Sequence, residues 1–423
     1  MQLMELECDI KDINLAEQGK KQIEWAMRDM PVLCQIKDRF QKEQPFKGLK
    51  IGICNHVTKE TANLGIALQA GGAEVLLAAS NPLSTQDDVA ASLVKDYGVK
   101  VFGYAGEDTD TYKSHMQKLL DFHPDFIVDD GGDAVCAMHK ERPEQLKEVI
   151  GSTEETTTGI IRLKALEKSG QLSWPAVGIN ESMTKHLYDN RYGTGQSALD
   201  GIIRGANVLL SGKTVVIVGY GWCGKGCAMR ARGFGANVIV TEVDPLKALE
   251  AVMEGYSVMP MNEACKVGDI FLTITGDRHV IDIQHMMQMK DGAMLANAGH
   301  FDHEFNYAAL AEKAVNIKQI RPNLEEMQME DGRSLFAFCK GRLVNLVAAE
   351  GHPASVMDMS FSNQALGVEF IIKNRKNLEN KFYVLPKEND INIATLKLKS
   401  MGIEIDTLTP EMEEYLNSWQ VGT

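Results

Sequence analysis

Three glycines and one carboxylate in the middle of the chain have the residue types and the spacing of a dinucleotide site. Gly219, Gly221 and Gly224 form a G-x-G-x-x-G turn directly after the apolar run 215–218, and Glu242 follows 23 residues after the first glycine. The first glycine permits a tight turn, the second lets the backbone approach a pyrophosphate, and the third lets the next helix pack closely on its strand. Glu242 can accept hydrogen bonds from both ribose hydroxyls and would repel a 2′-phosphate. The stretch therefore predicts a site for NAD rather than for NADP.

Polar side chains also gather where four predicted strands of the N-terminal half end. They follow directly after apolar runs, in the segments 55–61, 80–87, 129–133 and 180–182. Ligands of parallel sheets bind beyond the carboxyl ends of the strands, so these four segments should converge on one pocket. Such a collection of hydroxyl, amide and carboxylate groups predicts a ligand that carries many hydroxyls. In the second half, Thr275, Asn297 and Asn345 stand at comparable strand ends, as partners for the amide and ribose of a nicotinamide.

The elements that must position these residues are two arrays of alternating strands and helices. The predicted strands of the first array are 50–54, 74–78, 100–104, 126–128 and 176–179. Those of the second are 215–218, 237–241, 257–259, 270–273, 293–296 and 315–320, followed by a hairpin of 335–338 and 343–346 about Lys340-Gly341. Strands separated by helical segments are typical of doubly wound parallel sheets. The predicted fold class is α/β, with two Rossmann-like doubly wound parallel-sheet domains joined by hinges and a short C-terminal tail.

Two hinge candidates set the predicted domain limits. The segment 184–195 carries two glycines among polar residues and predicts a helix that runs into a hinge, and Gly351-His352-Pro353 is the second candidate. Further helices are predicted over 11–45, 354–374 and 410–419. We expect a substrate-binding domain at 1–184 to which 354–400 returns, an NAD-binding Rossmann domain at 195–350, and a C-terminal tail at 401–423.

The composition argues against several classes of protein. The 423 residues include 44% apolar and 24% charged residues, which is ordinary for a soluble globular protein of about two to three domains. The net charge is −14, from 44 Lys and Arg against 58 Asp and Glu, and there is no basic tract. We therefore expect no nucleic-acid partner. No run approaches the ~18 apolar residues of a membrane span, and the acidic N-terminus does not resemble a signal peptide.

The eight cysteines are scattered along the chain rather than grouped in a metal-binding pattern. Cys223 and Cys227 lie inside the nucleotide turn and its helix, where a zinc ion would obstruct the phosphates. We expect reduced thiols, no metal and a cytoplasmic location.

Several longer motifs stand in one order along the chain. They are Ser84-Thr85-Gln86-Asp87, the run 129–133, the run 154–159, Lys185 with Asp189-Asn190, and the runs 219–226, 297–302 and 351–353. On these motifs the chain resembles the S-adenosylhomocysteine hydrolase family along nearly its whole length, in a form with a short C-terminal tail. The resemblance implies two Rossmann-like domains, a tightly held NAD and a homotetramer. It also implies reversible cleavage of the small molecule S-adenosylhomocysteine to adenosine and homocysteine.

The reaction that the resemblance implies explains why a hydrolase would hold a redox cofactor. A thioether at C5′ of a ribose is a poor leaving group. Oxidation of the 3′-hydroxyl to a ketone makes the C4′ proton acidic, because the carbanion becomes an enolate. The thiolate then leaves by β-elimination, water adds to C5′, and the hydride returns to C3′. The net redox change is zero, so the cofactor can stay bound.

The resemblance also implies roles for individual side chains. Lys185 and Asp189 would handle the 3′-hydroxyl, with Lys185 taking its proton. Such a lysine needs a depressed pKa, which a nearby nicotinamide cation would favour. Asn190 and Glu155 would fix the ribose hydroxyls.

At the other end of the ribose, Asp130 and His56 are the candidates for moving the C4′ proton and for acid–base work at C5′, and His300 would assist on the nucleophile side. The sequence does not apportion these steps. The remaining expected substrate contacts are Thr58, Glu60, Thr61, Gln86 and His352. The expected cofactor contacts are Thr156, Thr157, Thr158, Asn190, Gly219, Gly221, Trp222, Cys223, Gly224, Glu242, Thr275, Asn297, Gly299 and Asn345.

Two features depart from the family pattern. Thr194 stands where many members have a cysteine near the nicotinamide, so a thiol at this position is not required here. Longer members end in a basic, tyrosine-bearing tail that reaches the NAD of a neighbouring subunit. This chain has no Lys or Arg after Lys399. We therefore expect NAD to be held less tightly than in long-tailed relatives.

The base of the substrate is a separate question, because some short relatives prefer the inosyl thioether. Adenine presents a donor amine at C6 and hypoxanthine an acceptor oxygen. The carboxylate of Glu60 in the pattern Thr58-x-Glu60 favours adenine, whereas the neighbouring Lys59 keeps the inosyl alternative open. Two other readings remain: an ordinary NAD-dependent dehydrogenase, and a non-catalytic regulatory relative that binds NAD.

Overall fold

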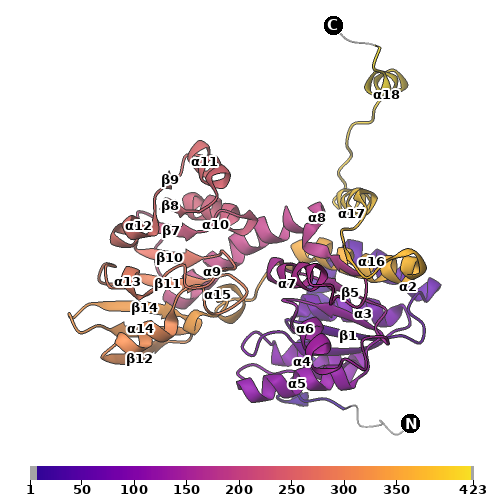
Figure 1. The fold of residues 1–423 in the computed structure, drawn as a ribbon, viewed down its shortest axis with the longest axis horizontal. Coiled ribbons are helices and arrows are strands. Elements are labelled where there is room, and N and C mark those ends of the chain that lie inside the picture. Colours follow the sequence, from indigo (N-terminus) through magenta and orange to yellow (C-terminus); the bar gives the residue numbers. More distant parts are fainter. Residues whose placement is uncertain (1–6, 421–423) are drawn as a thin grey trace.

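The chain folds around two separate β-sheets, each of which forms one lobe of the protein in the computed structural model (Figure 1). The structure describes residues 7–420. No helix in this range is long and apolar enough to cross a membrane.

The first sheet has seven strands in the order β15-β6-β5-β4-β1-β2-β3, and every neighbouring pair is parallel. The strands are β1 (Lys50–Asn55), β2 (Glu74–Ala79), β3 (Lys100–Phe102), β4 (Phe126–Asp129), β5 (Gly151–Glu154), β6 (Ala176–Gly178) and β15 (Phe382–Tyr383). The helices of this lobe are α1 (Ala16–Arg28), α2 (Pro31–Glu43), α3 (Lys59–Ala70), α4 (Asp87–Tyr97), α5 (Thr109–Asp121), α6 (Asp133–Glu141), α7 (Thr157–Lys168), α16 (Ala354–Asn374) and α17 (Lys387–Ser400). The strand β15 pairs with β6, and α16 packs on α2 and α3, so these late elements belong to the first lobe.

The second sheet has eight strands in the order β12-β13-β14-β11-β10-β7-β8-β9. Its six strands from β14 to β9 pair in parallel, and β12 and β13 add an antiparallel edge. The strands are β7 (Thr214–Val218), β8 (Asn237–Thr241), β9 (Ser257–Val258), β10 (Ile270–Thr273), β11 (Met294–Asn297), β12 (Asn316–Arg321), β13 (Leu324–Gln328) and β14 (Ser334–Phe338). The helices are α9 (Thr194–Ala206), α10 (Trp222–Gly233), α11 (Pro245–Met253), α12 (Met261–Val267), α13 (Ile283–Met286), α14 (Tyr307–Lys313) and α15 (Val344–Val347). The predicted α/β class with two doubly wound sheets is confirmed.

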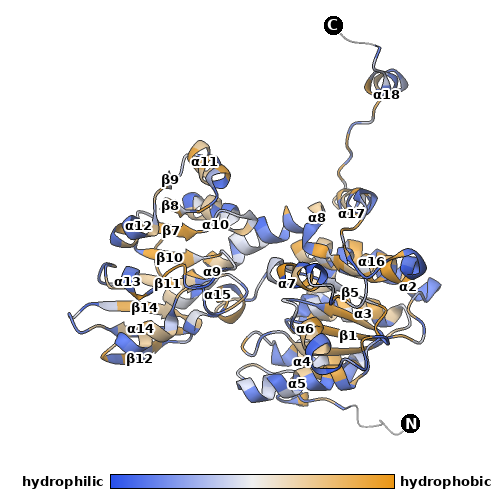
Figure 2. Ribbon diagram, in the orientation of Figure 1, coloured by the Kyte–Doolittle hydropathy of each residue, from blue (hydrophilic) through white to orange (hydrophobic). Residues whose placement is uncertain are grey.

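Both sheets are buried on their two faces, as sheets covered by crossover helices must be. Figure 2 shows the central strands as apolar bands between helices whose outer sides are polar. Ile51, Ile53 and Val128 lie in the core of the first lobe, and Val215 and Ile217 in that of the second. These rigid sheets fix the strand ends from which the functional loops start.

The connection between the lobes is helical. In the segment 184–195, α8 (Met183–His186) leads through a π-helical turn at Asp189–Gly193 directly into α9. The hinge expected in this segment stays a prediction. Gly195 serves close packing here, because a Cβ on it would lie 2.7 Å from the backbone of Gly226 in α10.

The predicted hairpin of 335–338 and 343–346 is wrong. The first of these strands exists as β14, but it pairs antiparallel with β13, in the register Leu324↔Phe338 and Gln328↔Ser334. Residues 344–347 form the short helix α15. The strand β13 has the sequence Leu-Glu-Glu-Met-Gln, which lacks the apolar alternation of a strand and so gave no signal.

The C-terminal helix α18 (Pro410–Asn417) lies away from both lobes, at the end of an extended segment (Figure 1). None of its residues is buried. The predicted helix at 410–419 is confirmed, two residues shorter at its end.

Candidate active site

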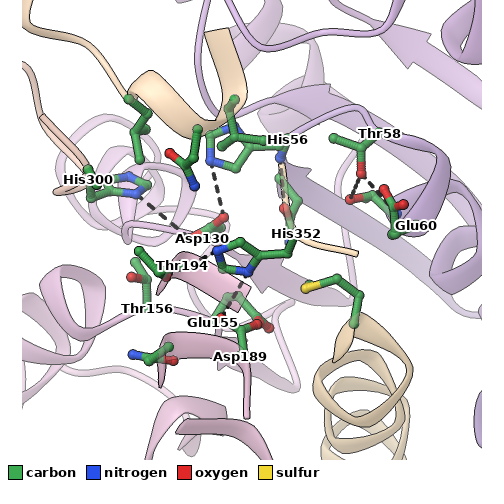
Figure 3. Close-up of a pocket in the computed structure, with 18 of the residues that line it drawn as sticks. His56, Thr58, Glu60, Asp130, Glu155, Thr156, Asp189, Thr194, His300 and His352 are labelled. Carbon is green, nitrogen blue, oxygen red and sulfur yellow. Dashed lines mark hydrogen bonds and ion pairs between the residues drawn. The ribbon is translucent and has the colours of Figure 1, made fainter. Parts of the chain in front are cut away.

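A pocket opens between the two lobes and collects most of the polar residues that the sequence singled out. The loops of the first sheet contribute Asn55, His56, Thr58, Glu60, Thr61, Asp130, Glu155 and Thr156. The connecting helical segment contributes Lys185, Asp189, Asn190 and Thr194. The second lobe contributes Cys223, Ala298, His300, Leu343, Asn345 and Leu346. The chain that leads back to the first lobe contributes Glu350, His352, Met357 and Phe361. Figure 3 shows the central side chains pointing toward one another.

Asp130 lies between two histidines that come from different lobes. Its carboxylate is 3.6 Å from Nε2 of His56 and 3.9 Å from Nδ1 of His300 (Figure 3). His56 follows β1 and is hydrogen-bonded through Nδ1 to the hydroxyl of Ser84, 2.7 Å away. Burial lowers the pKa of His56 to about 4, although Asp130 acts in the opposite direction. The imidazole of His56 is therefore neutral near neutral pH, with one ring nitrogen facing the carboxylate of Asp130.

Lys185 lies in the connecting segment with its ammonium group surrounded by oxygen atoms. Nζ donates to the side-chain oxygens of Asn180 at 2.8 Å and Asn190 at 3.0 Å. It is also 3.5 Å from one carboxylate oxygen each of Glu155 and Asp189. Only 3% of the lysine is exposed, so these four partners replace its water shell.

In the protein without NAD, the pKa of Lys185 is not depressed as the reaction would require. Burial alone would lower the pKa, but the charges of Asp189 and Glu155 outweigh burial and raise it. Burial in turn raises the pKa of Glu155 even though Lys185 opposes the shift. The group therefore holds a cation at the point where the lobes meet.

Asp189 stays ionised because three groups support its charge. Burial acts to raise its pKa, but Lys185, His352 and the hydroxyl of Ser360 together lower it. Nδ1 of His352 is 3.1 Å from one carboxylate oxygen, and Ser360 donates to the other at 2.7 Å. Nε2 of His352 is 3.1 Å from the hydroxyl of Thr194, at the position where the family often has a cysteine. His352 thus bridges two residues of the connecting segment.

The expected base-binding residues lie at the start of α3. Thr58 caps this helix, and its hydroxyl accepts the N–H of Thr61 at 3.4 Å. Glu60 is 2% exposed, its Oε1 atom has no hydrogen-bond partner in the protein, and burial raises its pKa. Such an orphaned acceptor suits a ligand that donates a hydrogen bond.

The neighbours of Glu60 point elsewhere. Nζ of Lys59 forms an ion pair with Glu350 at 2.8 Å, away from the base-binding carboxylate. Gln86 accepts the backbone N–H of Lys59 at 3.0 Å and does not line the pocket. The side chain of Gln86 thus holds the start of α3, and its contact with substrate stays a prediction.

The nucleotide turn has the features that a dinucleotide requires. Gly219 has φ +102°, which favours glycine, and a Cβ on Gly224 would lie 2.0 Å from the carbonyl oxygen of Gly219. Gly221 has open space where a Cβ would be. Glu242 accepts the backbone N–H groups of Tyr220 and Val243, both at 2.7 Å. The geometry of this turn fits NAD.

Two further side chains carry unpartnered buried oxygens at the expected nicotinamide end. Oδ1 of Asn345 and the hydroxyl of Thr158 have no hydrogen-bond partner in the protein. Cys223 lines the pocket, and its pKa is raised to about 11 because it is buried. The thiol is therefore protonated near neutral pH.

Three predicted cofactor residues are occupied by protein contacts. The amide of Asn297 donates to the carbonyls of residues 299, 301 and 341, and its oxygen accepts the N–H of Gly299. Thr157 accepts a hydrogen bond from Asn180 at 3.0 Å. Trp222 stacks on His186 with ring centroids 5.1 Å apart. Asn297 therefore shapes the loop that carries His300.

Several residues of the site carried no sequence signal. Glu304 is 1% exposed and accepts the N–H of Thr275 at 2.8 Å and of Gly276 at 2.7 Å. Gln364 on α16 donates to Glu155 at 2.6 Å. Ser360, which donates to Asp189, is the third. Their partners are distant in the sequence, so only the fold could identify them.

Comparison with known proteins gives a consistent set of relatives. The chain matches the family model described as S-adenosyl-L-homocysteine hydrolase over residues 7–148, and that of its NAD-binding domain over residues 190–351. It is 59% identical to the adenosylhomocysteinase of Gloeothece citriformis, with 99% of this chain and 98% of the relative covered. It is 57% identical to that of Aquifex aeolicus (99% and 100% covered) and 55% identical to that of Saccharolobus solfataricus (98% and 99% covered).

Proposed function

The chain belongs to the S-adenosyl-L-homocysteine hydrolase family, and from this premise we propose that it reversibly hydrolyses S-adenosyl-L-homocysteine to adenosine and L-homocysteine. The observation that carries the proposal is the pocket between the lobes. It combines a buried lysine between carboxylates with an aspartate between two histidines, beside a turn that fits NAD. These two groups match the two ends of the ribose at which the reaction needs proton transfer.

We assign the sugar oxidation to the group around Lys185. Bound NAD would supply the hydride acceptor and donor for C3′ of the sugar. Lys185 would hold the 3′-oxygen and take up its proton after giving its own to a neighbouring acceptor. Asp189 is ionised and would keep that cation in place, and Asn190 and Glu155 would orient the ribose hydroxyls.

We assign the elimination and the addition of water to Asp130, His56 and His300. One of these groups must remove the C4′ proton, and one must protonate the leaving sulfur or activate water at C5′. Burial keeps His56 neutral at pH 7, so it can act as a base, and it lies within reach of Asp130. A positioned acid–base group of this kind typically contributes ~10²–10⁴-fold.

The cofactor would be held mainly by backbone groups of the second lobe. Gly219, Gly221 and Gly224 would receive the pyrophosphate at the start of α10, and Glu242 would receive the adenosine ribose. Asn345 would receive the nicotinamide end with its free oxygen. An NAD-dependent dehydrogenase would not need the acid–base group around Asp130.

The base is expected to be adenine. Glu60 offers an unpartnered acceptor oxygen to the C6 amine, and the ion pair of Lys59 with Glu350 removes the nearby cation that would have favoured an acceptor base. All the relatives named above are adenosylhomocysteinases, so they do not support the inosyl or the regulatory alternative.

The test is the release of homocysteine thiol from S-adenosyl-L-homocysteine by the purified protein with NAD. S-inosyl-L-homocysteine serves as the second substrate. We expect thiol release with the adenosyl compound at a higher kcat/KM. No thiol release from either compound would contradict the function, and preferred release from the inosyl compound would contradict the base.

Four further expectations belong to the proposal. All eight cysteines are unpaired, which favours a reducing, cytoplasmic location. A homotetramer is expected from the family resemblance, and exposed apolar residues such as Leu246 on α11 and Trp419 in the tail are compatible with subunit contacts. The division into domains at 1–184 with 354–400, 195–350 and 401–423 stays a prediction, as does the weaker hold on NAD.

A further inference from the structure

A buried carboxyl group underneath the pocket has no part in the reaction as assigned so far. Glu154 ends β5, beside Asp129 at the end of β4, and is fully buried. Its Oε1 atom accepts the backbone N–H of Gly131 and that of Thr156, each at 2.9 Å. Its Oε2 atom has no partner. The side chain thus joins the two loops that carry Asp130 and Glu155.

The Gly131 peptide is held from both sides. Its N–H donates to Glu154, and its carbonyl accepts from Nη1 of Arg162 at 2.7 Å. The residue has φ +102°, a conformation that only glycine adopts readily. Because both polar groups of the residue are bonded to fixed partners, its loop has a single well-defined course.

His300 of the second lobe packs directly on this peptide. A Cβ on Gly131 would lie 2.2 Å from Nε2 of His300, so the imidazole occupies the space that any other side chain would fill. The other ring nitrogen, Nδ1, is 3.9 Å from Asp130. The position of the Gly131 peptide therefore decides how His300 meets Asp130 across the two lobes.

We propose that Glu154 is a positioning residue for the elimination step: it fixes the Gly131 peptide as the surface on which His300 rests, and so places Asp130 between His56 and His300. This inference rests on the proposed function. The carboxyl acts as a hydrogen-bond acceptor and not as a charge. Consistently, burial and the neighbouring Asp129 raise the pKa of Glu154 well above its ordinary value.

The oxidation group is held by other contacts. Lys185 and Asp189 are fixed by Asn180, His352 and Ser360, whereas the hydrogen bonds of Gly131 go to Glu154 and Arg162. Glu155 follows Glu154, but its side chain is held separately by Gln364. Loss of Glu154 should therefore impair proton removal at C4′ much more than oxidation at C3′.

The test uses the full-length holoenzyme and three measurements. Appearance of NADH on mixing with adenosine reports oxidation, exchange of the C4′ hydrogen with solvent deuterium reports proton removal, and thiol release from S-adenosyl-L-homocysteine reports the whole reaction. The variants are Glu154→Leu, which removes the acceptor, Glu154→Gln, which keeps it without charge, and Arg162→Met, which frees the other side of the peptide. Thr153→Val is the matched control, because it removes an unpartnered buried hydroxyl from the same strand.

We expect Glu154→Leu to lower C4′ exchange and thiol release by about 10²-fold while NADH formation stays within about threefold, since a displacement of about 1 Å costs that much. Glu154→Gln and Thr153→Val should stay close to the parent protein in all three measurements. Arg162→Met should also lower C4′ exchange and thiol release, but by less than Glu154→Leu does. Arg162 is partly exposed, so this variant decides the question if Glu154→Leu does not fold.

Three results would overturn the inference. They are a Glu154→Gln variant as impaired as Glu154→Leu, an equal loss of oxidation and exchange, or unchanged exchange in Arg162→Met. A parent protein that does not hydrolyse S-adenosyl-L-homocysteine would instead contradict the proposed function, and the two failures are therefore distinguishable.

Discussion

The carboxyl ends of the two sheets present different chemical groups to their ligands. At the first sheet the pocket is lined by buried titratable side chains, such as His56, Asp130 and Glu155, whose charges depend on one another. At the second sheet the glycine turn presents backbone, with Gly219 at positive φ and the carboxylate of Glu242 bonded to backbone N–H groups. The first sheet thus presents mostly side chains to the pocket, whereas the glycine turn of the second sheet presents mostly backbone.

Burial explains the difference. Removal of a charged group from water is costly unless partners replace the water, so a buried cluster such as that around Lys185 fixes both geometry and protonation. Glu242 is partly exposed and needs no such network. Mutations at the carboxyl end of the first sheet should thus change the rate of the reaction. Mutations in the glycine turn of the second sheet should change the affinity for NAD.

The largest expected effect comes from Lys185→Ala. We expect kcat for thiol release to fall by about 10³-fold with the NAD content of the purified protein unchanged, because we assign the removed group to the 3′-oxygen. Steady-state thiol release and the bound nucleotide are measured together. Lys168→Ala, at the end of α7, is the control and should retain normal turnover. Normal turnover in Lys185→Ala would break the comparison.

A second, smaller effect is expected at the carboxyl end of the second sheet. Glu242→Ala removes the acceptor of three backbone N–H groups, those of Tyr220, Val243 and Asp244, and of the expected ribose hydroxyls. Charged hydrogen bonds contribute about 1.5–3 kcal/mol. We expect NAD affinity to fall about 10–100-fold by calorimetric titration, with near-normal kcat at saturating NAD. Glu263→Ala on α12 provides an exposed acidic control. A loss of kcat that saturating NAD does not restore would show that the two edges are not separable.

The third effect concerns which substrate is preferred. Glu60→Lys replaces the buried acceptor by a donor and should shift the kcat/KM ratio toward S-inosyl-L-homocysteine by at least about tenfold. Glu60→Gln, which keeps the size and presents both a donor and an acceptor, should give an intermediate ratio. An unchanged ratio in the lysine variant would show that the base is read elsewhere.

The smallest effect concerns stability at acid pH. The pKa of His56 in the folded protein is about 4, below the ordinary value of 6.5, so the unfolded chain takes up this proton first. The contribution of neutral His56 is complete above pH 6.5 and is lost as the pH falls from 6.5 toward 4. Between pH 7 and pH 5, we expect the free energy of unfolding of His56→Asn to fall by about 2 kcal/mol less than that of the parent protein.

Denaturant titrations at the two pH values measure this difference. His303→Asn in the second lobe alters an exposed histidine and should leave the pH dependence as it is. Equal acid sensitivity of the parent protein and His56→Asn would mean that His56 is already charged in the folded state.

Much of the fold follows from local patterns in the sequence. The glycine turn, the apolar strands and the helix over 354–374 could be predicted because each pattern spans only neighbouring residues. The strand β5 could not, since its residues Ser152, Thr153 and Glu154 are polar although fully buried. A buried polar strand is recognised only once its hydrogen-bond partners are known.

The sequence by itself determined the α/β class, the fit to NAD and the residue types of the site. The tertiary structure alone decided how those residues act. It gave Lys185 a raised pKa, used the whole amide of Asn297 to shape a loop, and brought His300 against Gly131 from the other lobe. The physical reason is that protonation and position depend on every charge and contact within a few ångströms, and those neighbours are set by folding rather than by order in the chain.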